Sequence, residues 1–467
     1  MNTNGTAEVL SKSEIELIIS QALRILAEVG VRLPNLRMIS ILADHGARID
    51  RDQQMAFFPS TLIERFFAET ERVNLEEPPA LAFTAGAYPQ YFHDPETGRV
   101  QPHTLETVIH MTRLADALDD ITIVYDGMGV PSDIPEILAP LYMRLVVWKY
   151  TRKGGCGQVH LTALLPYVLE MSEVMAEHQG GSLADFAFLT IQMISPLRFG
   201  QEELEQFMFF WERGLKVEPG QILSAGGTAP VTLAGALSLQ LAECLVINLI
   251  KRFFYNSYKL EFSNSTTVLD MKNAVFQYGR PELALTHLAM GQLARYFGAE
   301  FVANSFLGDA KVPSCELGMQ KALTAIPAIL AGTRSLGTLG LLSVDEVGSP
   351  TQLIIDHEFA GALKRFARGF EVNEDTLAFD LIRQVGPGGL FTGTVHTARH
   401  YRKEHWQPSL FSREMYRTWA ESGALSDSQR AASRYKTILA SHHATYISEK
   451  TETALRRVIQ KAQDHLI

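Results

Sequence analysis

Cysteine is scarce in this sequence, and neither sign of charge gathers into a block. The 467 residues include three cysteines, Cys156, Cys244 and Cys315, with no CxxC pair. A disulfide framework and a cysteine-rich zinc site are therefore both disfavoured. With 42 Lys plus Arg against 52 Asp plus Glu, the net charge is −10. An acidic chain without a basic block makes a poor partner for nucleic acid, although a local site could still hold an anion.

Long hydrophobic runs are also missing. The longest apolar stretches, such as Leu241–Ile250, are too short to span a bilayer and are interrupted by Glu243 and Asn248. The first 16 residues show no basic segment followed by an apolar core, so no signal peptide is expected. Hydrophobic residues make up 46% and charged residues 20%, which is typical of a globular protein. We expect a soluble cytoplasmic protein with no membrane partner.

Several catalytic motifs are absent as well. The sequence has no GxSxG elbow, no GxxxxGK[ST] phosphate loop and no Cys-His nucleophile signature, so hydrolase and kinase functions have little support. His396 and His400 are four residues apart but lie outside an HExxH pattern, which favours a structural or solvent-facing role over metal binding. The cluster Asp356-His357-Glu358 could hold a ligand, or could be the acidic first turn of a helix.

Two kinds of pattern divide the chain. Residues 1–85 are predicted to be helical, because apolar residues recur at three- and four-residue spacing, as in Ile15–Val29. Residues 86–102 are predicted to form a β-hairpin, because aromatic residues flank Asp-Pro and Thr-Gly turn signals. Beyond them, short apolar runs alternate with helical segments. The predicted strands are 121–125, 154–159, 186–194, 222–227, 253–262, 301–307 and 335–342.

Seven strand-then-helix units favour an α/β fold with a parallel sheet. An eighth strand is placed at 386–394 or shortly before Asn373. A doubly wound sheet is the alternative, but the GxGxxG loop expected after its first strand is missing. We predict a (β/α)8 TIM barrel over 104–402, which meets the roughly 250 residues that such a barrel needs. Helices and the hairpin in 1–103 precede it, and a helical extension in 403–467 follows it.

In such a barrel the active site forms at the carboxyl ends of the strands. This rule points to Gln158–His160, to the turn Gly226–Thr228 and to Asp309. The glycines could let a large flat group approach the backbone, or could simply form a tight turn. Glu261 lies on an otherwise apolar strand, and a buried carboxylate needs a partner or a purpose.

Six motifs stand together in a fixed order. They are Ala22–Val31, Asp94–Gly98, Gly226–Gly235, Asp270–Lys272, Gly386–Gly389 and His396–Arg402. Over nearly the whole chain they resemble the trimethylamine methyltransferase family. The resemblance implies a (β/α)8 barrel that moves a methyl group from an amine to the cobalt of a corrinoid, the cobalamin-type cofactor, carried by a separate partner protein. It implies no tightly bound metal in this chain.

The resemblance also indicates a branch of that family. The archaeal trimethylamine enzymes carry pyrrolysine in the barrel, whereas the comparable region here, Gly308–Lys321, contains only standard residues. The chain thus resembles the branch without pyrrolysine, whose known members demethylate quaternary amines such as glycine betaine. A quaternary nitrogen already carries its positive charge, so the amine leaves as a neutral group. Neither a general acid nor zinc is then required.

On this basis we expect a site made of aromatic faces for the trimethylammonium group, attracting carboxylates, donors for a substrate carboxylate and polar lining residues. The predicted substrate-binding residues are Tyr91, Tyr255, Glu261, Asn264, Asp309, Glu316, Gln320, His357, Phe391 and His396. The residues predicted to face the corrin ring are Gly226, Gly227, Thr228, Gly388 and Gly389. No residue is assigned to a chemical step.

Two other hypotheses stay open at this point. One is a barrel that binds a quaternary amine without transferring a methyl group. The other is a barrel lyase or decarboxylase that acts on an acidic metabolite. The predicted C-terminal helices, 412–421, 426–441 and 448–466, either cover the barrel or build a contact between copies of the chain, so a homo-oligomer is possible.

Overall fold

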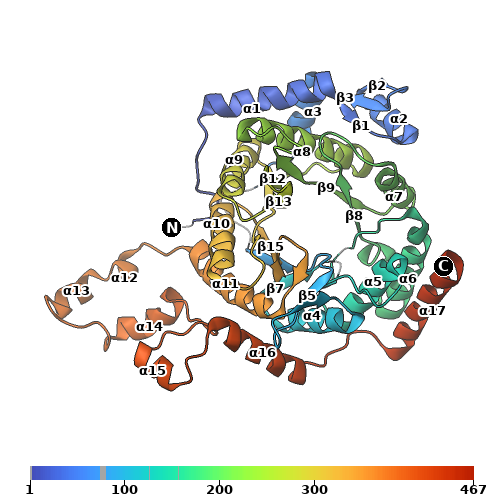
Figure 1. Ribbon diagram of the computed structural model, residues 1–467. Helices are drawn as coiled ribbons and strands as arrows, with labels where there is room; N and C mark the ends of the chain where they lie inside the picture. The colour runs from blue at the N-terminus through green and yellow to red at the C-terminus, as the bar shows by residue number, and fades with distance from the viewer. Residues whose placement is uncertain (1–2, 74–79, 126, 156) are drawn as a thin grey trace.

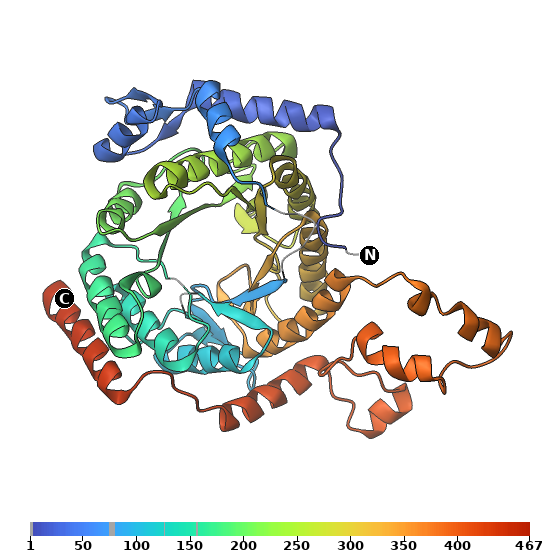
Figure 2. The same ribbon diagram turned by 180° about the vertical axis from the view of Figure 1, so that it is seen from behind.

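A ring of parallel strands with helices outside it forms the body of the molecule (Figures 1 and 2). The computed structural model describes residues 3–73, 80–125, 127–155 and 157–467. The parallel pairs are β4 (Ala82–Ala85) with both β7 (Ile121–Val124) and β15 (Ser335–Leu339), β8 (Leu189–Met193) with β9 (Val217–Gln221), β10 (Leu223–Ala225) with β12 (Thr266–Asp270), and β11 (Glu261–Asn264) with β14 (Glu300–Ala303). The predicted parallel α/β fold is confirmed.

The ring is not one continuous hydrogen-bonded ladder among the described residues. The parallel pairs just named belong to four separate sheets. Between β7 and β8, the described residues show only two single bridges, from Val124 to Gly154 and from Gly157 to Leu189. A closed barrel therefore stays a prediction at this point.

Helices form the outer wall of the ring, because each has an apolar face that packs on the strands. They are α4 (Leu105–Ala117), α5 (Ala139–Tyr150), α6 (Leu165–Gln179), α7 (Gln201–Trp211), α8 (Leu233–Tyr255), α9 (Pro281–Phe297), α10 (Cys315–Ala331) and α11 (Pro350–Arg368). Helix α8 is longer than the predicted apolar stretch and apolar enough to cross a membrane, but 83% of its apolar window is buried inside the protein. That burial is typical of a core helix in a soluble protein.

The N-terminal region contains three helices and a small sheet that the sequence pattern did not indicate. The helices are α1 (Lys12–Arg24), α2 (Leu36–Asp44) and α3 (Ser60–Glu69), and an antiparallel sheet joins β1 (Val31–Arg32), β3 (Met55–Phe57) and β2 (Arg48–Asp50). The prediction of an entirely helical 1–85 is wrong for these strands and for β4. Strands of two to four residues are too short to show an alternating pattern.

The predicted hairpin at 86–102 is confirmed. Strand β5 (Tyr91–His93) pairs antiparallel with β6 (Val100–Pro102). Strand β5 also pairs parallel with β17 (Val347–Gly348), which returns from β16 (Leu341–Leu342). A second hairpin joins β12 to β13 (Val275–Gln277). The first hairpin thereby ties the region before α4 to the region after β15.

Two predicted strands are wrong, each for a physical reason, and the described residues of a third, 154–159, form only single bridges, at Gly154 and Gly157. The segment 253–262 begins as the last turn of α8, which ends at Tyr255 and is capped by Asn256 in the left-handed conformation. Strand β11 starts only at Glu261. The segment 386–394 is a turn between α13 (Phe379–Val385) and α14 (Val395–Glu404). Gly386 and Gly388 have φ of 66° and 80° there, which a strand does not adopt. Strand β4 supplies the parallel strand that 386–394 was expected to provide.

The C-terminal region divides into a projecting part and a packed part. Helices α12 (Glu374–Leu377), α13, α14 and α15 (Tyr416–Glu421) project from the ring (Figure 1). Helix α16 (Asp427–Ser441) packs on α11, and α17 (Glu449–Leu466) packs on α6. The predicted domain boundaries at 103/104 and 402/403 stay predictions, although β4, within 1–103, pairs with ring strands.

Candidate functional site

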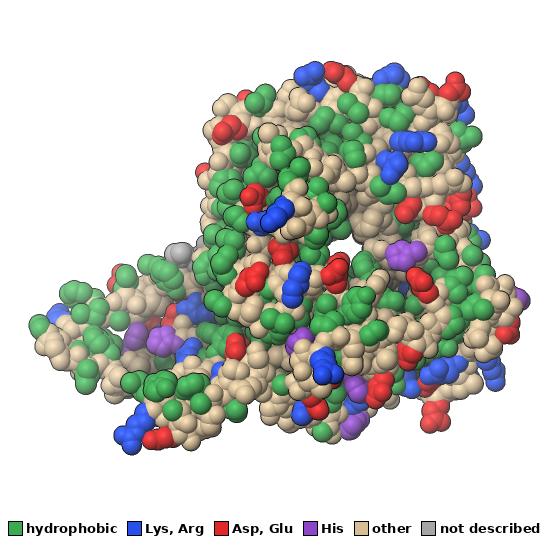
Figure 3. Space-filling view, in the orientation of Figure 1, with side chains coloured by type: hydrophobic (Ala, Val, Ile, Leu, Met, Phe, Trp, Pro, Cys, Tyr) green, Lys and Arg blue, Asp and Glu red, His purple; other side chains and the backbone are tan. Residues whose placement is uncertain are grey.

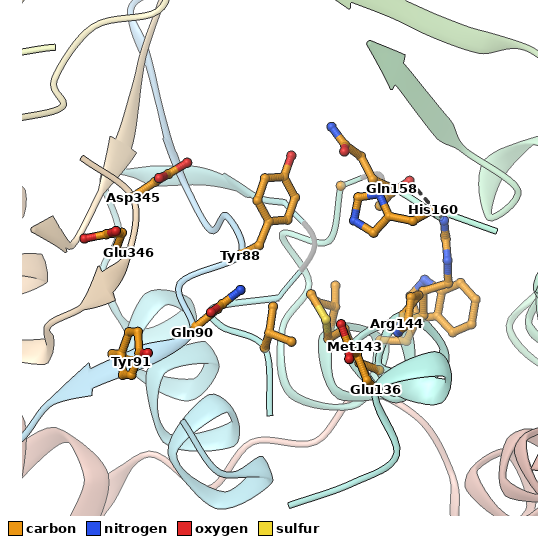
Figure 4. A pocket seen from close by; sticks show the side chains of 17 residues that line it. Tyr88, Gln90, Tyr91, Glu136, Met143, Arg144, Gln158, His160, Asp345 and Glu346 are labelled. Atoms are coloured by element: carbon orange, nitrogen blue, oxygen red, sulfur yellow. Dashed lines mark hydrogen bonds between the residues drawn. The ribbon is translucent and has the colours of Figure 1, made fainter. Parts of the chain in front are cut away.

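A cavity of about 530 Å³ opens where the chain leaves β4, β7 and β15 at their carboxyl ends. Figure 3 shows this face of the molecule hollowed at the centre of the ring, and Figure 4 shows the cavity from close by. The residues that line it are Tyr88, Gln90, Tyr91, Val130, Glu136, Ala139, Pro140, Met143, Arg144, Val147, Trp148, Gly155, Gly157, Gln158, His160, Asp345 and Glu346.

A sharp turn after β4 carries two tyrosines into this cavity. Gly86 has φ of 92°, and a Cβ added there would lie 2.0 Å from the carbonyl oxygen of Tyr125. Only glycine fits such an approach. The amide of Tyr91 donates to the carbonyl oxygen of Glu346 at 3.1 Å, which fixes the second tyrosine beside the loop after β15. Tyr88 and Tyr91 remain 37% and 43% exposed.

Aromatic and acidic side chains share the mouth of the cavity. The rings of Tyr88 and His160 lie edge to face, with centroids 6.5 Å apart. Asp345 reaches the same space from the opposite side, and Glu346 lies next to it (Figure 4). Burial raises the pKa of Asp345, and the neighbouring Glu346 carboxylate raises it further. The Ser343 hydroxyl donates to Glu346 Oε2 at 2.6 Å.

One wall of the cavity comes from α5. Met143 and Trp148 line it from this helix, together with Arg144. The Arg144 side chain is buried, and its Nη2 donates to the carbonyl oxygens of Gly157 and Phe188, both at 3.2 Å. The guanidinium thus ties the backbone at Gly157 and at Phe188 to α5.

A buried histidine supports the opposite wall. His103 is fully buried, and Cβ atoms built on Gly129 and Gly348 would lie 2.8 and 2.9 Å from its ring. Its Nδ1 pairs with the Thr107 hydroxyl at 2.9 Å. Burial lowers the pKa of His103 to about 4, so the ring is neutral at pH 7. It serves as packing under the loops that carry Val130 and Glu346.

The arrangement suits a positively charged ligand with an apolar surface. Tyrosine faces attract cations, and the attraction strengthens as water is excluded. Asp345 and Glu346 add negative charge at the same mouth. Within the described residues, no group of three His, Cys, Asp or Glu side chains is placed to hold a metal ion.

Of the predicted substrate residues, the structure places Tyr91 in this cavity. Tyr255 and Glu261 lie at the amino-terminal ends of the strands instead. The Tyr255 hydroxyl accepts a hydrogen bond from the Val217 amide at 3.0 Å. Glu261 forms ion pairs with Lys251 and Arg334, so its carboxylate has a structural partner.

Four other predicted residues are hydrogen-bonded within the ring: Asn264 ends β11, Asp309 lies in the loop before α10, and Glu316 and Gln320 are on α10. Asn264 Nδ2 donates to Thr286 Oγ1 and to His287 Nδ1. Asp309 accepts from the amides of Tyr278 and Gly279. Gln320 Oε1 accepts from the amides of Asp309 and Ala310, and its Nε2 donates to Glu316. Their roles in binding stay predictions.

The remaining predicted residues lie apart from the cavity. His357 is on α11, with Nε2 3.8 Å from Asp120 Oδ2. Phe391, His396, Gly388 and Gly389 belong to the projecting part of the chain.

The glycine-rich turn after β10 also lies outside the residues that line the cavity. Gly226, Gly227 and Thr228 form this turn, in which the Thr228 hydroxyl accepts from the Ser224 amide. Whether it faces a corrin ring stays a prediction.

Sequence reasoning missed most of the cavity. The strand-end rule does point to Gln158 and His160, which line it. Tyr88 follows a strand too short to recognise, and Asp345 follows a predicted strand whose end lay three residues earlier. An aromatic pair just before the Asp94–Gly98 motif was the available signal for Tyr88 and Tyr91.

A family model described as trimethylamine methyltransferase matches residues 1–466. The chain belongs to this family. A glycine betaine methyltransferase of Desulfitobacterium hafniense (strain Y51) is 26% identical over 97% of this chain and 96% of its own. A trimethylamine methyltransferase of Desulfitobacterium hafniense (strain DSM 10664 / DCB-2) is also 26% identical, over 97% and 94%. The predicted family is confirmed.

Two further matches are partial or distant. A trimethylamine methyltransferase of Methanosarcina barkeri is 30% identical over 53% of this chain and 50% of its own. Among solved structures, the hydroxylamine complex of MtmB aligns with a TM-score of 0.47 at 10% identity, over 99% of this chain and 96% of that one.

Proposed function

We propose that this protein is a methyltransferase that moves a methyl group from a small quaternary amine, glycine betaine or a related betaine, to the reduced cobalt of a corrinoid protein. Family membership over nearly the whole chain supports methyl transfer, and the full-length likeness to a glycine betaine methyltransferase supports the substrate class.

The observation that carries the proposal is the cavity that combines Tyr88 and Tyr91 with Asp345 and Glu346. A quaternary ammonium has no N–H to donate, so a site can recognise it only through charge and through aromatic contact. The cavity offers both in one space: Tyr88 lies across from Asp345, and Tyr91 lies on the same side as Glu346 (Figure 4). An uncharged substrate would gain little from the two carboxylates.

The bond changes need no proton. The cobalt of the acceptor supplies the electron pair for the new bond to the methyl carbon. The carbon–nitrogen bond breaks, and its electron pair remains on nitrogen, which leaves as a neutral tertiary amine. Glycine betaine would become dimethylglycine. The residues of this chain then have to hold the cation, exclude water from it and orient one methyl group outward.

The acceptor is a second substrate, so the site has to leave it a path. The cavity is open on the hollowed face at the carboxyl ends of the strands. We infer that the separate sheets are arcs of one (β/α)8 barrel, because the parallel strands follow one another around the ring in chain order. In such a barrel this face is where active sites form.

The experiment is methylation of cob(I)alamin, followed by its change in visible absorbance. We expect methylcobalamin to form when protein and glycine betaine are both present, and to be absent when either is omitted. Proline betaine, carnitine and γ-butyrobetaine complete the panel. If no member yields methylcobalamin, with free cobalamin or with a cognate corrinoid protein, the proposal fails. Calorimetric binding of a betaine without transfer would instead support a non-catalytic binding protein.

A further inference from the structure

The projecting part of the chain has almost no core of its own. We call residues 370–427 the arm. All of them are described, and among them only Leu410 is buried. Helices α12, α13, α14 and α15 contribute no buried residue at all. Fixing the backbone costs roughly 1–2 kcal/mol per residue, which such a segment cannot recover from its own contacts.

Polar contacts hold the arm at its base. Glu358 of α11 accepts from the amides of Ser409 and Leu410 at 2.8 and 2.9 Å. Arg365 of α11 donates to the carbonyl oxygen of Glu404 at 2.7 Å. The arm is therefore clamped on α11 at its return, while α12 and α13 extend into solvent (Figures 1 and 2).

Large apolar side chains cover the arm. Four aromatic residues, Phe379, Phe391, Tyr401 and Tyr416, are 68%, 41%, 38% and 79% exposed. At about 200 Å² for each aromatic side chain, they alone expose on the order of 450 Å². Summed over α13, α14, α15 and the turn that holds Phe391, this area compares with the roughly 300–600 Å² of the largest single apolar patch on a typical monomer.

Aliphatic residues enlarge this surface. Leu377, Ile382, Leu390, Val395 and Met415 are all more than half exposed. With them, the apolar surface of the arm comes close to the roughly 800 Å² that each partner buries in a standard stable interface. A surface of this size and composition is typical of a permanent contact, because permanent interfaces are more hydrophobic than transient ones.

We propose that the arm is a dimerisation element that packs against a second copy of this chain. A corrinoid protein has to dock and leave in each cycle, so a permanently apolar arm suits it poorly. A second copy can stay bound, and a twofold arrangement covers both arms at once. Charge opposes the contact little: residues 370–427 hold eight Asp or Glu and six Lys or Arg, a net charge of −2, and Arg383 is the one formally charged side chain within 381–398.

The test is the mass of the protein in solution by sedimentation velocity. The wild-type chain is expected at twice its mass of 51.9 kDa or a multiple of that. The double variant Phe379→Asp/Leu390→Asp is expected at the mass of one chain, because charge on these exposed positions blocks an apolar contact. The control Leu17→Asp alters an equally exposed apolar residue on α1, 71% exposed and on another side of the ring, and is expected to leave the mass unchanged.

Hydrogen exchange of the wild-type protein tests the same proposal without relying on the fold of a variant. Amides of 377–398 are expected to exchange more slowly as protein concentration rises through the dimer dissociation constant. A monomeric wild-type protein would overturn the proposal. So would a double variant that dimerises as well as the wild type, or exchange in the arm that does not depend on concentration.

Discussion

Replacing Tyr88 with leucine tests the cation site most locally. The substitution keeps an apolar side chain of moderate size but removes the aromatic face at the mouth of the cavity. A cation–π contact contributes about 0.5 kcal/mol at an exposed site and about 2 kcal/mol when desolvated. Tyr88 is 37% exposed and stands against His160, so its contribution should fall within that range.

These energies correspond to a rise in KM of roughly 2- to 30-fold, since each 1.36 kcal/mol is a factor of ten. The measurement is the initial rate of methylcobalamin formation against substrate concentration. Tyr88→Phe keeps the aromatic face and should remain within about 2-fold of wild type. Tyr296→Leu is a matched control, because that tyrosine is 45% exposed on the outer helix α9. A folded Tyr88→Leu protein with an unchanged KM would refute the reasoning.

Three further predictions concern buried or half-buried charge. Asp345→Asn should raise KM for a quaternary amine. Because the pKa of Asp345 is raised, the KM of the wild-type protein should start to rise on acidification at a higher pH than it would with an ordinary carboxyl, and the variant should lack this acidic rise in KM. Burial raises the pKa of Glu243 to about 7 from its ordinary 4.5, so between these pH values the folded state holds a proton that the unfolded state has lost. The free energy of unfolding should therefore fall as pH rises from about 4.5 to 7. Urea unfolding at both pH values should show a smaller fall for Glu243→Gln than for the wild-type protein. Lys321 and Asp356 form a fully buried ion pair, so Lys321→Met should destabilise the protein by about 3–5 kcal/mol, and adding Asp356→Leu should restore much of that, both measured by denaturant unfolding.

The helices were the most predictable part of this fold. Helix α9 begins at Pro281 and ends before Gly298, and both residues are sequence signals for the end of a helix. The predicted strand 253–262 failed because the apolar run of α8 continues into it, and hydrophobicity alone does not say where a buried helix ends. Strand β4 is four residues long and leaves no periodic signal.

The site was less predictable than the fold, because it depends on contacts between distant parts of the chain. Tyr88 and Asp345 meet only because β4 and β15 are neighbours in the ring. Glu261 was expected to have a partner or a purpose and was assigned to the substrate; its ion pair with Arg334 depends on strand order, which the sequence does not show. The spacing of residues along the sequence does not show which loops lie next to each other at one end of a ring. A family resemblance gives that information indirectly, because it implies the order of the strands.

The central claim is that a quaternary ammonium gives up one methyl group to reduced cobalt in this protein. Nuclear magnetic resonance with glycine betaine labelled with ¹³C in its methyl groups tests it directly. The account predicts one dimethylglycine and one ¹³C-methylated cobalamin for each betaine consumed. The contrary result is unchanged betaine and no ¹³C on cobalt when folded protein and a cognate corrinoid protein are both present. The same result with the other betaines would then contradict the claim.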